Sequence, residues 1–245
     1  MSKRIQYGLI GKTLSHSFSP AYFARKFERE GIAATYSAFE LTQIEEFPAL
    51  LLQHPILHGL NVTVPYKKAV IPFLDALDIH AQAIGAVNCI AFAGGQLKGY
   101  NTDWIGFLHS LKTAFNPLPA GALVLGSGGA AAAVCYALKQ GGIPFKVVSR
   151  NPADGHIGYA EINAEILREY PLLVNTTPLG TSPNILDSPP LPFELLKPQN
   201  ALFDLVYNPA QTAFLAQGVA HGCPTQNGLP MLEIQAAESW KIWQE

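Results

Sequence analysis

The chain has 245 residues and a net charge of −2, and 14% of its side chains are charged against 49% hydrophobic. This composition is typical of a compact globular protein and excludes an intrinsically disordered one. No basic stripe is present, so we do not expect nucleic acid as a partner.

The cysteines and the N-terminus indicate the compartment. Cys89, Cys135 and Cys223 are scattered and odd in number, which is typical of free thiols in a reducing environment. The N-terminal apolar run is too short for the core of a signal peptide. We therefore expect a cytoplasmic protein.

Two local features suggest a metal site or a membrane span, and neither interpretation is favoured. His54 and His58 lie four residues apart, but Pro55 between them argues against a regular helix that presents both, so no metal site is expected. Residues 120–138 are uncharged and nearly long enough to cross a bilayer. Their central GSGG would break such a helix, and a strand, a glycine turn and a helix explain the segment better.

The first hundred residues alternate between strand and helix patterns. A helix is predicted over 19–31, with Ser19 as N-cap, Pro20 at the first helical position and Gly31 after the end. A hairpin is predicted over 86–101, turning at Gly94 and Gly95. The other predicted elements are strands at 4–11, 35–41 and 57–65, and helices at 44–53 and after Lys67.

A second α/β series follows a helix predicted over 101–115, which has Thr102 or Asp103 near its start. The segment 116–121, NPLPAG, breaks the chain and is the best candidate for a linker. Strands are then predicted at 122–126, 144–150, 171–180 and 201–209, with helical stretches to the end. The fold class is therefore α/β, with two domains, 1–101 and 102–228, that join near residue 102.

A glycine motif indicates a dinucleotide site in the second domain. Gly126, Gly128 and Ala131 have G-x-G-x-x-A spacing directly after a strand, which is the context of the Rossmann fingerprint. Gly126 permits the tight turn, Gly128 lets the backbone approach a pyrophosphate, and Ala131 allows the helix to pack close to the sheet. The alternative is a strand–helix turn that binds no ligand.

The end of the next strand indicates which dinucleotide binds. NAD sites usually have an acidic residue there for the ribose hydroxyls, but this strand ends in Ser149, Arg150 and Asn151. A guanidinium suits the 2′-phosphate of NADP, so the sequence favours NADP over NAD. The alternative is that Arg150 is an ordinary surface arginine.

The stretch NVTVPYKKAV places Lys67 where a strand gives way to a helix. The start of a helix carries partial positive charge and favours acidic residues, so a cation there is unexpected. Lys67 is either a solvated surface lysine or a residue placed for a ligand.

Several motifs occur in the order seen in one family: HSFSP, NVTVPYK, GAVN, NTD, GSGGAA, NTTPLG and NGLPMLEIQAA. On these motifs the sequence resembles the shikimate dehydrogenases over nearly its whole length. The resemblance implies NADP-dependent interconversion of 3-dehydroshikimate and shikimate, a step of aromatic amino-acid biosynthesis. It also implies an N-terminal substrate-binding domain onto which residues 229–245 pack back, and a Rossmann-like, doubly wound NADP-binding domain.

The resemblance further assigns roles to single residues. The catalytic pair would be Lys67 and Asp103. The substrate would be bound by Ser17, Ser19, Thr63, Asn88, Tyr207 and Gln235. The cofactor would be bound by Gly126, Ser127, Gly128, Gly129, Ala130, Ser149, Arg150, Asn151, Leu205 and Gly228.

Three alternatives and one departure accompany these assignments. A relative that oxidises both quinate and shikimate would use the same lysine and aspartate. The second alternative is a binding protein that kept the fold without the chemistry. The third is a two-domain dehydrogenase of another substrate.

The segment after Arg150 is shorter than the family pattern and lacks its usual second basic residue. We expect a monomer or a homodimer.

Overall fold

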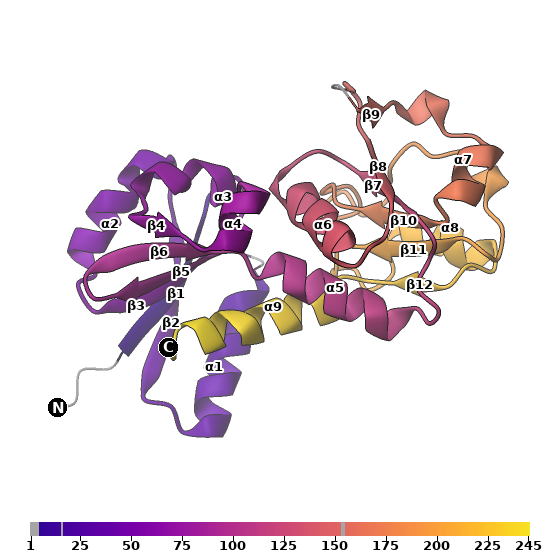
Figure 1. Cartoon of the computed structure of the whole chain (residues 1–245). Coiled ribbons are helices and arrows are strands. Elements are labelled where there is room, and N and C mark those ends of the chain that lie inside the picture. Colours follow the sequence, from indigo (N-terminus) through magenta and orange to yellow (C-terminus); the bar gives the residue numbers. More distant parts are fainter. Residues whose placement is uncertain (1–4, 16, 153–154) are drawn as a thin grey trace. The chain divides into compact units, whose positions relative to one another are not determined.

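The computed structural model describes residues 5–15, 17–152 and 155–245, and Figure 1 shows the course of the chain. The chain divides into two compact units: unit 1 comprises Met1–Thr102 and Ala236–Glu245, and unit 2 comprises Asp103–Gln235. The chain therefore passes between the units twice, after Thr102 and after Gln235. Each unit combines a six-stranded sheet with helices, which confirms the predicted α/β fold class.

Unit 1 alternates strands and helices for most of its length. Its strands are β1 (Ile5–Gly11), β2 (Ala34–Glu40), β3 (Leu57–Val62), β4 (Ala76–Leu77), β5 (Cys89–Ala93) and β6 (Gln96–Tyr100). Its helices are α1 (Phe18–Glu30), α2 (Phe47–Gln53), α3 (Tyr66–Ala69) and α4 (Ile79–Ile84), with 3₁₀ turns at Ile44–Glu46 and Ile71–Phe73. Residue 4, which the predicted first strand included, lies outside the described residues.

The sheet of unit 1 is mixed and has the order β2-β1-β3-β5-β6-β4. β1 pairs in parallel with β2 and β3, whereas β5 is antiparallel to β3 and β6. One face packs on α2, through Phe47 and Leu50. The other face packs on α1 and on Trp243, which directly follows α9 (Leu229–Ile242).

Three local predictions in unit 1 can be compared with the structure. The hairpin of β5 and β6 turns at Gly94 and Gly95, both of which have positive φ, as predicted. Gly31 ends α1 in the left-handed conformation, also as predicted. The predicted N-cap was wrong, because α1 begins at Phe18 with Ser17 as N-cap, so that Ser19 and Pro20 lie inside the first turn. Proline is tolerated there because the first amides of a helix have no partner within the helix.

The helix predicted after Lys67 is much shorter than expected. β3 ends at Val62, and α3 makes a single turn before the chain continues as a 3₁₀ turn and then as β4. Pro72 lies in that 3₁₀ turn, and a proline removes a helical hydrogen bond, which accounts for the interruption. Lys67 is the second residue of α3.

Unit 2 follows the same alternation around a second sheet. Its strands are β7 (Ala122–Leu125), β8 (Phe145–Val148), β9 (His156–Ile157), β10 (Leu172–Asn175), β11 (Ala201–Asp204) and β12 (Thr225–Gln226). Its helices are α5 (Asp103–Ala114), α6 (Gly129–Gln140), α7 (Ala164–Glu169), α8 (Ala213–Ala220) and the first half of α9, with 3₁₀ turns at Tyr159–Glu161 and Phe193–Leu195. Residues 116–121, the predicted linker, connect α5 to β7 within this unit, so that prediction was wrong.

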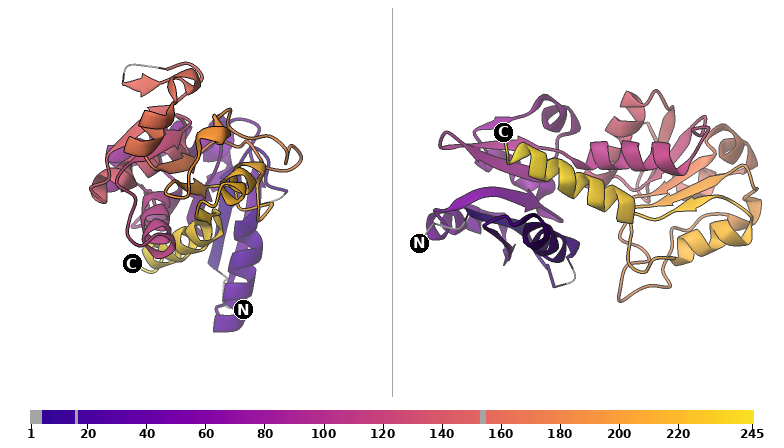
Figure 2. Two further views of the ribbon diagram at one scale, coloured as in Figure 1. Left: turned by 90° about the vertical axis from the view of Figure 1, so that its right-hand side faces the viewer. Right: turned by 90° about the horizontal axis from the view of Figure 1, so that it is seen from below.

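The sheet of unit 2 is parallel throughout and has the order β12-β11-β10-β7-β8-β9. The chain runs outward from β7 to β9 on one side and from β10 to β12 on the other, as in a Rossmann-like doubly wound fold. Figure 2 shows helices on both sides of this sheet. Successive residues of β7 alternate between the two cores, since Val124 packs with α5 and α6 whereas Leu123 packs with α7 and α8.

The cysteines are free thiols in the structure. Cys89 and Cys223 are buried and Cys135 is partly buried. Within the part of the chain that the structure describes, no helix combines the length and the apolar character that crossing a membrane requires.

Candidate functional site

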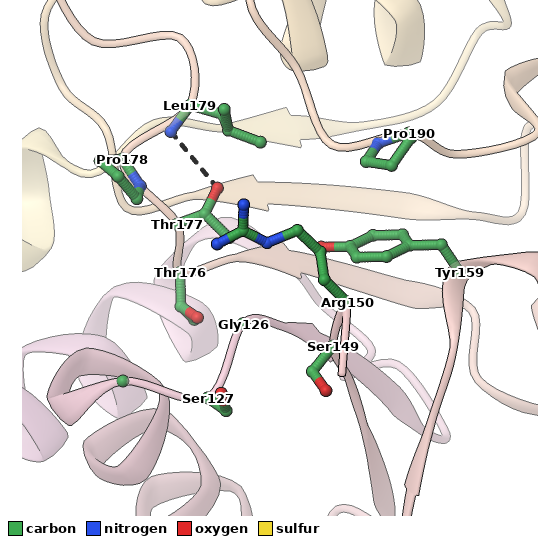
Figure 3. A pocket seen from close by; sticks show the side chains of 11 residues that line it. Gly126, Ser127, Ser149, Arg150, Tyr159, Thr176, Thr177, Pro178, Leu179 and Pro190 are labelled. Carbon is green, nitrogen blue, oxygen red and sulfur yellow. Dashed lines mark hydrogen bonds between the residues drawn. The ribbon is translucent and has the colours of Figure 1, made fainter. Parts of the chain in front are cut away.

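A pocket lies at the carboxyl edge of the parallel sheet in unit 2, where the strand order reverses between β7 and β10. Open parallel sheets bind ligands at this position, because the loops on either side of the reversal diverge. The pocket has a volume of about 400 Å³. It is lined by Gly126, Ser127, Gly128, Ser149, Arg150, Tyr159, Thr176, Thr177, Pro178, Leu179 and Pro190, most of which are labelled in Figure 3.

The glycine loop between β7 and α6 forms one wall of this pocket. Gly126 has φ +110°, and a Cβ atom there would lie 2.8 Å from Oγ1 of Thr176, so only glycine fits without strain. A Cβ atom on Gly128 would meet open space, which leaves room for a ligand. Gly129 and Ala130 open α6, and no side chain caps its N-terminus. The helix therefore offers backbone amides and the positive end of its dipole to an anion.

The end of β8 supplies a hydroxyl and a guanidinium to the same pocket. Oγ of Ser149 is buried and has no hydrogen-bond partner among the described residues, which is unusual for a buried hydroxyl and fits a ligand contact. Arg150 is exposed, and in Figure 3 its side chain extends toward Thr177 beside the ring of Tyr159. Asn151 is also exposed but does not line the pocket. These groups fit a dinucleotide that carries an additional phosphate.

Tyr159 was not predicted from the sequence. It lies in the 3₁₀ turn after β9, where the Glu161 carboxylate accepts a hydrogen bond from the Gly158 amide at 2.6 Å. Burial raises the pKa of the Tyr159 phenol, and the positive charge of Arg150 opposes that rise. The phenol therefore stays neutral at physiological pH and can donate a hydrogen bond.

The loop after β10 was also missed, although its sequence NTTPLG had been noted as a family motif. Oγ1 of Thr176 donates to the carbonyl of Leu125 at 2.6 Å, which joins this loop to β7. Thr177 donates to Oδ1 of Asn175 from its amide at 3.0 Å and from its hydroxyl at 2.7 Å. The available signal was position alone, because these residues follow a buried parallel strand.

Leu205 and Gly228, two predicted cofactor positions, lie against each other in unit 2. A Cβ atom on Gly228 would collide with the Leu205 carbonyl, and the Gly228 amide donates to the carbonyl of Val206 at 3.2 Å. Glycine is therefore required for this close approach of two backbone segments. Of the predicted substrate residues in this unit, Tyr207 is half-buried, and Gln235 is buried with its Nε2 donating to the Leu232 carbonyl at 3.0 Å.

Unit 1 holds a buried polar network around two other predicted substrate residues. Asn88 accepts from the Thr102 amide at 2.7 Å and donates to the Thr102 hydroxyl at 3.0 Å. Ser19 is buried and hydrogen-bonds with Tyr36. Burial, as the larger effect, raises the pKa of Tyr36 well above its ordinary value, and the Ser19 bond opposes this.

Asn61 joins these two parts of the network and was missed by the sequence analysis. Its Oδ1 accepts from the Tyr36 hydroxyl at 2.8 Å, and its Nδ2 donates to Oγ of Ser239 at 2.9 Å and to the carbonyl of Asn88 at 3.1 Å. Oγ of Ser239 lies 3.2 Å from Oγ1 of Thr102. The partners are far apart in the chain, so no spacing pattern could have indicated them.

The remaining predicted residues lie at the ends of elements. Ser17 occupies the N-cap position of α1 without a capping bond from its side chain; it is partly exposed, and its amide donates to the Leu14 carbonyl at 2.9 Å. Thr63 directly follows β3, where its amide donates to the Ile10 carbonyl at 2.9 Å. The backbone of Lys67 accepts a hydrogen bond from the Val87 amide at 2.7 Å. Asp103 is buried and opens α5 as the first residue of unit 2.

The fold and pocket of unit 2 define a Rossmann-like dinucleotide site within a two-unit α/β protein, and comparison with known proteins identifies the family. A family model described as the shikimate dehydrogenase substrate binding domain matches residues 9–90. Shikimate dehydrogenase (NADP(+)) of Thermus thermophilus is 39% identical, over 98% of this chain and 92% of its own length. The Oleidesulfovibrio alaskensis protein of the same name is 41% identical, over 97% and 88%.

A crystal structure of shikimate 5-dehydrogenase from Thermus thermophilus in complex with NADP(H) and shikimate has the same fold. It is 38% identical to this chain, with a TM-score of 0.88, and the match covers 98% of this chain and 93% of that one. The chain belongs to the shikimate dehydrogenase family, which confirms the resemblance seen in the motifs.

Proposed function

We propose that the protein is an NADP-dependent shikimate dehydrogenase that reversibly reduces 3-dehydroshikimate to shikimate. The observation that carries the cofactor assignment is the pocket of unit 2, in which Arg150 and Ser149 line the same space as the glycine loop; the Ser149 hydroxyl has no partner in the described part of the chain. Among the residues that the structure describes, no carboxylate lines that pocket, whereas a ribose-binding carboxylate is usual in NAD sites. Relatives that share about two fifths of the sequence are named as NADP(+) enzymes, which supports the same assignment.

Each part of the pocket has a defined task in this proposal. The amides at the start of α6 bind the pyrophosphate. Arg150 forms charge-assisted hydrogen bonds with the 2′-phosphate, and Ser149 donates its hydroxyl nearby. NADPH, when bound, supplies the hydride for the reduction at C3 of the substrate.

The substrate side of the proposal rests on the polar residues that the family motifs assign to substrate binding. Ser17 and Ser19 bind the substrate carboxylate, and Thr63 and Asn88 hydrogen-bond to the ring hydroxyls together with Asp103. Tyr207 and Gln235 complete the substrate contacts. Lys67 donates the proton to the oxygen on the reacting carbon, with Asp103 as its acidic partner, and acid–base assistance of this kind contributes about 10²- to 10⁴-fold in rate.

The first experiment is a nicotinamide absorbance assay of the purified chain with shikimate and with quinate, each in the presence of NADP or NAD. Turnover of shikimate with NADP supports the proposal. Shikimate turnover mainly with NAD would contradict the role given to Arg150. Comparable quinate turnover would move the assignment to a dual-specificity enzyme, and absence of turnover with both acids would favour a binding protein without this chemistry.

A substitution at Lys67 tests the catalytic assignment, and the adjacent Lys68 provides a matched control because it is exposed on the same helical turn. We expect Lys67→Ala to lower kcat by about 10²-fold or more, with little change in KM for shikimate, because it removes the proton donor. Lys68→Ala should retain the wild-type rate. A large rise in KM with kcat intact would reassign Lys67 to substrate binding.

A further inference from the structure

A buried carboxylate is connected by hydrogen bonds to the wall of the nucleotide pocket but does not line it. Asp204 is the last residue of β11 and is fully buried. Its Oδ1 accepts from Nδ2 of Asn175 at 3.0 Å and from the Val206 amide at 3.0 Å, and its Oδ2 accepts from the Thr212 hydroxyl at 2.6 Å. Donors from the ends of three different segments therefore converge on one side chain.

The bond to Asn175 connects Asp204 with the wall of the pocket. The side-chain oxygen of Asn175 accepts both the amide and the hydroxyl of Thr177, while its Nδ2 also lies 3.3 Å from the Leu179 carbonyl. Thr177 and Leu179 line the pocket and are seen in Figure 3. An amide has one acceptor and one donor end, so the carboxylate fixes which end of Asn175 faces Thr177.

The bond to Val206 connects Asp204 with a second part of the cofactor-binding edge. The Val206 carbonyl accepts from the Gly228 amide at 3.2 Å, and the Leu205 amide donates to the carbonyl of Asn175 at 3.0 Å. Leu205 and Gly228 are the predicted cofactor positions that contact each other. The same carboxylate therefore restrains both the loop after β10 and the segment after β11.

Thr212 fixes the remaining oxygen of Asp204. Its hydroxyl donates to Oδ2 of Asp204 and accepts from the Leu215 amide at 3.2 Å, as N-cap of α8. Because the hydroxyl has a single proton, the bond from Leu215 leaves that proton for Asp204. The carboxylate is thereby held in one orientation.

The environment of Asp204 is unfavourable for a charge. Burial raises the pKa of Asp204 to about 6, and the bonds from Thr212, Val206 and Asn175 oppose that rise without cancelling it. Groups with shifted pKa values of this kind are concentrated at functional sites, because stability alone does not favour a buried charge. The hydrogen bonds of Asp204 give a reason for a carboxylate at this buried position, because they connect the two segments beside the pocket.

We propose that Asp204 is a positioning residue for cofactor binding, whose carboxylate holds the Thr177 loop and the Leu205–Val206 segment in the arrangement that binds NADP. The inference rests on the proposed function, since it assigns NADP to this pocket. Asp204 acts through Asn175 and the Val206 amide and does not itself contact the cofactor.

The test compares NADP⁺ binding to the full chain, wild type and Asp204→Asn, by isothermal titration calorimetry. Asparagine keeps the size of the side chain but replaces one acceptor oxygen with a donor. We expect NADP⁺ affinity to fall about tenfold or more, as for loss of a charge-assisted hydrogen bond, while KM for shikimate changes by less than about twofold. Substitution of a residue that only stabilises the fold would not lower NADP⁺ affinity while leaving KM for shikimate unchanged.

Asn200→Ala is the matched control. Asn200 is also buried and precedes the same strand at its opposite end, where its Nδ2 donates to the Leu167 carbonyl at 2.8 Å, away from the residues that line the pocket. Its loss should lower stability and leave NADP⁺ affinity unchanged. If Asp204→Asn does not fold, Asn175→Ala takes its place, since it removes the connection to Thr177 while Thr212 still donates to Asp204.

Different results of these binding measurements would refute the role of Asp204 and the proposed function. Wild-type affinity in Asp204→Asn, or in Asn175→Ala where that variant is used, would overturn the inference, and so would an equal loss in Asn200→Ala. Failure of the wild-type chain to bind NADP⁺ would refute the proposed function, and the inference would fall with it.

Discussion

The titration of Asp204 predicts how the stability of the protein depends on pH. Its pKa is about 6 in the folded chain against an ordinary value of 3.8. The folded state therefore binds this proton more tightly than the unfolded state does. Protonated Asp204 favours folding at low pH, and that contribution is lost as the pH rises through about 6.

The magnitude follows from the size of the change in pKa. One pH unit corresponds to about 1.4 kcal/mol, so the ionised carboxylate costs about 3 kcal/mol relative to the acid. Over an accessible range, from about pH 4.5 to about pH 7.5, linkage gives a loss of about 2 kcal/mol. Asp204→Asn cannot titrate at this position and lacks that loss.

The assay is urea unfolding of the wild type and of Asp204→Asn at several pH values in that range. Other carboxylates titrate in both proteins, so their effects cancel in the difference between the two free energies of unfolding. We expect the wild type to lose about 2 kcal/mol relative to the variant as the pH rises. A difference that stays constant, or that changes in the opposite direction, would refute the reasoning from burial.

Two further predictions concern the glycine loop and the core of unit 1. Gly126→Ala should destabilise the protein by about 1–2 kcal/mol and weaken NADP⁺ binding, because alanine is strained at φ +110° and its methyl group would press on Thr176. Unchanged NADP⁺ affinity in calorimetry would show that the loop does not require glycine. Trp243→Phe should lower the free energy of unfolding by about 1–3 kcal/mol, because it removes the buried hydrogen bond from Nε1 of Trp243 to the Ile90 carbonyl at 3.0 Å. Wild-type stability in urea unfolding would contradict this.

The sequence was most informative where the structure depends on neighbouring residues. The turn at Gly94 and Gly95, the end of α1 at Gly31 and the loop at Gly126 were predicted correctly, because each depends on a backbone conformation that glycine adopts readily. Arg150 was selected because it directly follows a recognisable strand; it lines the pocket, and its role in cofactor binding stays a prediction.

The parts that were missed depend on contacts between distant segments. Asn61 meets Ser239, and Asn175 meets Asp204, only after the sheets have formed. No periodicity or spacing links such partners in the chain. α3 is shorter than the helix expected after Lys67, because Pro72 interrupts the helix.

The roles given to Lys67 and Asp103 stay predictions, since they concern chemistry and not position. The structure places Lys67 in α3 of unit 1 and Asp103 at the start of α5 in unit 2. Their assignment came from the family motifs, and the kinetic comparison of Lys67→Ala with Lys68→Ala tests it directly.

The buried thiols make the two units separately observable. Cys89, in unit 1, and Cys223, in unit 2, are both buried, and burial raises the pKa of Cys89 to about 12 and also raises the pKa of Cys223. Because only the thiolate reacts with alkylating reagents, both cysteines are protected at neutral pH until the structure around them opens. Pulsed alkylation followed by peptide mass spectrometry would therefore yield an opening free energy for each unit within one unmodified chain.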